Sequence, residues 1–147
     1  MTTTHSQLYS LTEFLGLTFK ELVYRRSTEK EKNDCWFIDE TELIHRTFEK
    51  IKEEYKEKFP ILQNLHFATQ GLFPYSHELN QALHLLYQSG MLKKRNDENR
   101  YAFGPTWFPD SKDVFEKRKN KLFNPEKTRN FEELAGKLAE ELEILVA

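Results

Sequence analysis

Cysteine, glycine and long apolar runs are scarce in this chain of 147 residues, and each scarcity excludes something. The one cysteine, Cys35, excludes a disulfide within the chain. Five glycines leave no glycine-rich loop of the kind that cradles phosphates. No stretch approaches the roughly 20 apolar residues that a helix needs to span a bilayer. Residues 1–10 show no basic region and no apolar run of the kind found in signal peptides, so we expect a cytoplasmic protein.

The composition is that of a packed globular protein with a strongly charged surface. Hydrophobic residues make up 38% and aromatic residues 14%, which favours a packed core over disorder. The length fits one domain, which we place over residues 1–147. The net charge of -2 hides a basic segment: residues 93–129 hold 11 Lys and Arg against 6 Asp and Glu, while both flanking segments are acidic. A local basic segment is what contact with a nucleic acid requires.

Apolar spacing and capping residues predict a mainly α fold with a small β-hairpin or sheet. Ser10 and Glu13 have the spacing of a capping box, Ser76 is a second cap, and Gly90 is placed to end the helix that Ser76 begins. Helices are expected over 10–26, from 39 or 41 to 59, over 61–69, 76–89 and 111–123, and from about 124 or 130 to the C-terminus, with strands over 35–38, 91–95 and 100–103.

The helices 61–69 and 76–89 followed by the hairpin have the order of a winged helix-turn-helix. We therefore expect a winged-helix core over about residues 39–108 and a C-terminal helical extension over 110–147. In this fold the second helix presents polar side chains to DNA bases and the hairpin supplies cations to the phosphates. The predicted nucleic-acid-binding residues are His77, Asn80, Gln81, His84, Gln88, Lys93, Lys94, Arg95 and Arg100.

The same features allow a different use, because a helix with outward Asn, Gln and His is also simply a solvated helix. The helix 76–89 contains no Lys or Arg, which disfavours insertion into a DNA groove. The cluster Tyr101, Phe103, Trp107 and Phe108 could stack single-stranded bases, but its residue types favour burial against the core. The leading expectation is a small non-enzymatic regulator of bacterial or phage origin that binds double-stranded DNA as a winged helix. The alternative is an adaptor-like module that uses the same surface to bind a protein partner without DNA.

Residues 72–92 resemble the SocA-like antitoxin domain, also called Panacea. The resemblance rests on "PYSHEL", a spaced leucine series and a final glycine, carried here by Pro74, Tyr75, Ser76, Glu78, Leu79, Leu83, Leu86 and Gly90. It implies a helical domain that binds a partner protein as an antitoxin or adaptor.

Residues that could carry catalysis or a metal lack the partners that such chemistry needs. Glu42 and His45 form a single E-x-x-H motif without a second copy, and His77 with His84 would need further ligands. Ser76 is explained as a helix cap, and Cys35 lies in an apolar strand. We therefore expect no enzymatic activity, no metal and no cofactor.

The C-terminal helix carries an apolar seam at spacings of three and four residues, close to a heptad pattern. The seam favours a homodimer, although it could equally close the core of a single chain. In the basic helix 111–123 the apolar residues are expected to pack on the body while Lys117, Lys119 and Lys121 face solvent. The predicted oligomer interface consists of Phe131, Leu134, Leu138, Leu142 and Leu145.

Overall fold

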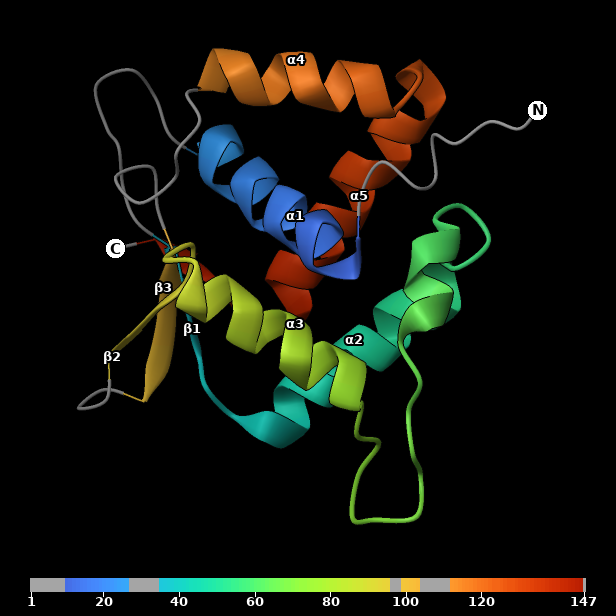
Figure 1. The fold of residues 1–147 in the computed structure, drawn as a ribbon, viewed down its shortest axis with the longest axis vertical. Helices are drawn as coiled ribbons and strands as arrows, with labels where there is room; N and C mark the ends of the chain where they lie inside the picture. Colours follow the sequence, from blue (N-terminus) through green and yellow to red (C-terminus); the bar gives the residue numbers. More distant parts are fainter. Residues whose placement is uncertain (1–9, 27–34, 96–98, 104–111, 147) are drawn as a thin grey trace.

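Five α-helices and a small antiparallel sheet make up the part of the chain that the computed structural model describes, residues 10–26, 35–95, 99–103 and 112–146. The strands pair in the order β2-β3-β1-β4, and the sheet lies to one side of the helices (Figure 1). The expected mainly α class with a small β-component is therefore confirmed. The elements are α1 (Leu11–Arg26), β1 (Cys35–Ile38), α2 (Thr41–Tyr55), a 3₁₀ helix η2 (Pro60–Asn64), α3 (His77–Gln88), β2 (Lys93–Arg95), β3 (Arg100–Phe103), α4 (Lys112–Leu122), α5 (Pro125–Glu141) and β4 (Leu145–Val146).

Local signals set where several of these elements begin and end. The Ser10 hydroxyl accepts from the Glu13 amide at 3.1 Å, and the Asn124 carbonyl oxygen accepts from the Lys127 amide at 2.8 Å. Both are side-chain caps of helix N-termini. Gly90 follows α3 with a φ of +87°, the left-handed conformation expected after a helix. The hairpin forms as predicted, with Lys93 opposite Ala102.

The helix expected over 61–69 does not form. Its place is taken by the five-residue η2, after which the chain runs extended and Ala68 bridges to Tyr75 through two backbone hydrogen bonds of 2.8 and 3.0 Å. Pro60 sits at the start of this turn, where its missing amide is tolerated, but too few residues follow before the chain is drawn into the bridge. The connection between α2 and α3 is thus a long loop rather than a helix and a tight turn.

Helix α1 lies at the centre of the molecule, packed against α3 and α5 (Figure 1). We expected only one face of this helix to be buried. Instead, all the side chains from Phe14 to Tyr24 are buried. Phe14 packs against Phe59 and Phe131, while Phe19 stacks on Phe37 of β1 at 5.7 Å. A helix surrounded on all sides joins the helical layer to the sheet in one core.

Helix α4 is fastened to this core by Lys119, which we expected to face solvent. Its side chain is 3% exposed, and its ammonium donates to Glu21 of α1 at 2.7 Å. Glu116 and Glu132 lie 3.4 Å away. Burial lowers the pKa of Lys119, but the hydrogen bond that Lys119 donates to Glu21 and the three carboxylate charges outweigh burial and raise the pKa overall. By contrast, Val114, which we expected to pack on the body, is 51% exposed.

The apolar seam of the C-terminal segment closes the core of the single chain, which is the second of the two alternatives drawn from the sequence. The helix expected to reach the C-terminus ends at Glu141, because the chain turns at Glu143 with a φ of +54°, so Leu142 follows α5 and Leu145 lies in β4. Four of its five side chains are at most 1% exposed, so they are not available to a second copy. The side chain of Leu145 lies outside the described residues, but its backbone pairs with Trp36 in the sheet. The four buried residues are Phe131, Leu134, Leu138 and Leu142.

Candidate interaction surface

The polar residues predicted on α3 share one solvent-exposed arc of that helix. Its opposite face is buried, with Leu79, Ala82, Leu83 and Leu86 in the core. Two large side chains share the exposed arc, Leu85 at 43% and Tyr87 at 44% exposure, which we had not singled out. The exposed predicted residues are His77, Asn80, Gln81, His84 and Gln88.

Two of the cations predicted on the hairpin, Lys94 and Arg100, have partners within the chain. Lys94 forms an ion pair with Asp39 at 2.8 Å, and this hydrogen bond and charge raise its pKa. The Arg100 guanidinium lies 4.0 Å from the centre of the Trp36 ring. Lys93 and Lys94 point to opposite faces of the sheet because side chains alternate along a strand. The Arg95 side chain lies outside the described residues.

Charged side chains are nearly absent from the segment that forms this region. The 34 residues from Phe59 to Leu92 contain one, Glu78, in a chain with 22 Lys and Arg and 24 Asp and Glu. Interface centres between proteins are depleted in charged residues, whereas DNA interfaces are rich in cations. This depletion is visible in the sequence and could have indicated the surface before the structure did.

The carboxylate of Glu78, the one charged group of this segment, accepts hydrogen bonds from within the protein. Its Oε1 accepts from the His66 amide at 3.0 Å and from the Ser76 hydroxyl at 3.1 Å. These hydrogen bonds, led by that from the His66 amide, lower the pKa of Glu78. The carboxylate also lies in the first turn of α3, where the helix dipole stabilises a negative charge.

The loop from residue 65 to residue 76, here the 65–76 loop, carries the most exposed apolar side chain recorded in the described part of the chain. Leu72 is 94% exposed, and the loop that contains it extends away from the helices (Figure 1). The base of the loop is fixed: Ala68 bridges to Tyr75, and the Lys52 ammonium donates to the Leu65 carbonyl at 2.7 Å. A fixed loop with an apolar tip is suited to insertion into a partner.

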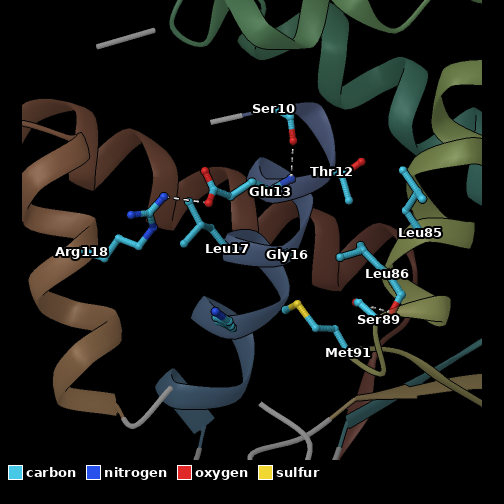
Figure 2. Close-up of a pocket in the computed structure, with 11 residues that line it drawn as sticks. Ser10, Thr12, Glu13, Gly16, Leu17, Leu85, Leu86, Ser89, Met91 and Arg118 are labelled. Carbon is cyan, nitrogen blue, oxygen red and sulfur yellow. Dashed lines mark hydrogen bonds and ion pairs between the residues drawn. The ribbon is translucent and has the colours of Figure 1, made fainter. Parts of the chain in front are cut away.

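A groove runs between α1 and the C-terminal half of α3 (Figure 2). It has a volume of about 520 Å³, within the range of ligand-binding sites. Gly16 brings α1 close to its neighbours, since a Cβ there would lie 3.3 Å from the Met91 methyl carbon. Arg118 of α4 and Glu13 form an ion pair of 2.7 Å at the rim. A second hollow shares Leu85 with the groove and reaches Gln81, so the groove opens onto the exposed face of α3.

We define the uncharged surface as the exposed side chains of the 65–76 loop and α3 that carry no formal charge. Large apolar groups and hydrogen-bonding groups alternate on it, which suits recognition of another protein. Its larger members are His66, Gln70, Leu72, His77, Asn80, Gln81, His84, Leu85, Tyr87 and Gln88.

The residues considered for catalysis or metal binding have other partners. Glu42 pairs with Arg46 at 2.9 Å, while His45 is buried and turned toward Ser76. The Ser76 hydroxyl is fully buried, accepts from the Leu79 amide and donates to Glu78. Cys35 is buried on β1. Within the described residues no three His, Cys, Asp or Glu side chains gather as a metal site would need, and every helix is too short or too polar to cross a bilayer.

Comparison with families of proteins, with curated proteins and with solved structures finds no match to this chain.

Proposed function

We propose that this chain is a non-enzymatic protein-interaction module, an antitoxin-like or adaptor protein, that binds a partner protein through the uncharged surface. The observation that carries the proposal is the single charge between Phe59 and Leu92 in an otherwise highly charged chain. Removing water from a surface without charged side chains costs less free energy than removing it from a charged one. Apolar contacts and neutral hydrogen bonds can therefore form there at low cost. Leu72, Leu85 and Tyr87 supply the large side chains that anchor such interfaces.

The scaffold we propose for this surface is a winged helix. The order α1-β1-α2-α3-β2-β3 and the pairing of β3 between β1 and β2 support it. The long connection between α2 and α3 departs from the tight turn of the simplest motif. In this proposal the loop enlarges the recognition surface, which is consistent with the antitoxin-like resemblance of residues 72–92.

Site-specific photocrosslinking in the native host tests the proposal. A photoreactive amino acid at position 72 or 85 should capture the same protein, in a band whose partner is identified by mass spectrometry. Matched positions on charged exposed surfaces, 57 in the turn after α2 and 117 on α4, should not capture it. Binding of the purified partner should then weaken more than tenfold with Leu72→Asp or Leu85→Lys and stay unchanged with Glu57→Lys. Capture by all four positions, or by none, would contradict the proposal.

DNA binding is a second candidate function, favoured by the exposure of Asn80, Gln81 and His84. In this case Lys93, Lys94 and Arg95 hold phosphates, and their joint replacement by Ala should weaken binding and flatten its salt dependence. If the protein does not bind random duplex DNA at low salt, this candidate function is excluded. Because the uncharged surface has no need of salt-dependent contacts, insensitivity of binding to salt distinguishes the first function from the second.

A further inference from the structure

His45 is a buried histidine that connects α2 to the start of α3. It lies on the inner face of α2, 2% exposed, and its Nδ1 accepts the backbone N–H of Ser76 at 2.9 Å. An imidazole nitrogen can accept this bond only if it carries a lone pair, so Nδ1 is unprotonated and the proton of the neutral ring is on Nε2. The bond therefore exists in the neutral form of His45 and is lost in the charged form.

The same ring holds the end of the 65–76 loop. It stacks on Tyr75 at 4.4 Å with an angle of 11° between the planes, and Phe73 lies 6.4 Å away. Ser76 is the N-cap of α3 and bonds the Leu79 amide. One imidazole thus positions the last residues of the loop and the first turn of the helix, which are the two parts of the uncharged surface.

Protonation of His45 would replace this acceptor with a donor. A proton on Nδ1 would oppose the Ser76 N–H, and the new positive charge would lie at the positive end of the α3 dipole. Burial lowers the pKa of His45, as expected for a ring that is easier to charge once exposed.

Among the described residues, no charged side chain offsets this penalty. On α2, Glu42 is paired with Arg46, and Glu49 lies one turn after His45. On the facing side, Glu78 is bonded to the His66 amide and to Ser76, and His77 contacts Tyr75 at 5.2 Å. Burial is the one cause of the lowered pKa of His45 among the described residues.

We propose that His45 is a pH-sensitive switch beneath the uncharged surface: its protonation releases the 65–76 loop and the first turn of α3. The proposal rests on the proposed function for its consequence, weaker partner binding in acid, but not for the switch itself. The direction follows from the lowered pKa. The closed form is fully stable above the ordinary His pKa of 6.5 and loses stability as pH falls from there toward the lower pKa of the folded state. Across that interval local opening should become up to about tenfold more frequent per pH unit.

Hydrogen exchange of the Ser76 and Leu79 amides, corrected for the intrinsic pH dependence of exchange, measures this opening without a partner. Wild type should lose protection at both amides below pH 6.5. His45→Asn should keep constant protection, since its side-chain oxygen can accept near the position of Nδ1 and does not titrate. His84→Asn, on the exposed arc, is the matched control and should retain the wild-type profile. His66→Asn is a second control and should also retain the wild-type profile, because the His66 N–H that donates to Glu78 belongs to the backbone and is kept.

Side-chain ¹⁵N shifts of His45 provide a second measurement that does not depend on any variant folding. They should show the neutral form with the proton on Nε2 at pH 7 and a pKa below 6.5. A pKa at or above 6.5, or wild-type protection that stays constant while His45 titrates, overturns the switch. If protection falls as expected but no partner binds the surface at any pH, the switch stands and the proposed function fails.

Discussion

Replacement of Lys119 by Met should be among the most damaging single changes outside the apolar core. Met preserves most of the volume, so the change removes mainly the charged ammonium, which lies 5.3 Å from the centre of the Phe115 ring. Glu21, whose side chain is 6% exposed, then remains buried after the loss of its 2.7 Å ion pair with Lys119. Breaking a buried pair in this way costs about 3–5 kcal/mol.

The size of the cost depends mainly on Glu21 and little on the other two carboxylates. The side chains of Glu116 and Glu132 are 42% and 39% exposed, so both can turn to solvent when the ammonium is lost. The free energy of unfolding, measured by urea titration with circular dichroism, should fall by about 3–5 kcal/mol. A loss of this size corresponds to a decrease in Tm of roughly 6–20 °C for a domain of this length.

Two variants make the reasoning refutable. Lys117→Met removes an ion pair of α4 that is exposed on both sides, with Asp113, and should cost about 0–0.5 kcal/mol. Combining Lys119→Met with Glu21→Met removes both charges and should restore most of the lost stability, because an apolar pair often replaces a buried ion pair without loss. A cost below about 1 kcal/mol for Lys119→Met, or a double variant no more stable than the single one, would refute the account.

The raised pKa of Lys119 adds a pH dependence with a definite sign. A Lys whose pKa is higher in the folded state than its ordinary 10.5 contributes its full stabilisation below 10.5 and loses it as pH rises through the folded-state pKa. The difference in unfolding free energy between wild type and Lys119→Met should therefore stay constant from neutral pH to about 10 and shrink above it. A difference that grows above pH 10.5 would contradict the sign of the shift.

Three further predictions concern stability and use the same urea titration. Ser76→Ala should cost about 1–3 kcal/mol, because it removes the cap of α3 and leaves the buried Leu79 amide without an acceptor; Ser76→Thr, which keeps the hydroxyl, should lose less. Gly90→Ala should cost about 1 kcal/mol or more because of the φ of +87°, whereas Gly71→Ala, where a Cβ meets nothing closer than 3.9 Å, should be nearly neutral. Leu138→Glu should lower the free energy of unfolding of the single chain by more than about 4 kcal/mol, because Leu138 is fully buried. A variant that stays folded but associates more weakly in sedimentation would disprove this.

One part of the candidate site could be predicted from the sequence, and another part could not. The exposure of Asn80, Gln81 and His84 followed from helical spacing, because residues three and four apart share a face. The role of His45 did not follow, because its acceptor bond joins it to Ser76, 31 residues further along the chain. The sequence places His45 in an E-x-x-H motif, and only the packing of α2 under the loop shows that its nitrogen caps a backbone amide.

The features that depend on interactions between neighbouring residues were determined by the sequence itself. The caps at Ser10 and Ser76, the turn at Gly90 and the hairpin strands depend on a few neighbouring residues, and each was predicted from them. The helix expected after Pro60 failed for a related reason. Its apolar spacing was correct, with Leu62 and Leu65 buried, but the same spacing serves a 3₁₀ turn that leads into an extended loop.

Tertiary structure alone decided which side chains are covered and which charges are paired. An apolar seam such as that of α5 can meet a second copy or its own core, and only the packing of α1 against α5 fixes the second outcome. From the sequence, Lys119 is expected to be a solvated cation. The fold places its ammonium 2.7 Å from the carboxylate of Glu21, which is far away in sequence. Burial is a property of surfaces that meet across the chain, so the periodicity of a single segment shows that a face is apolar or polar but not what lies against it.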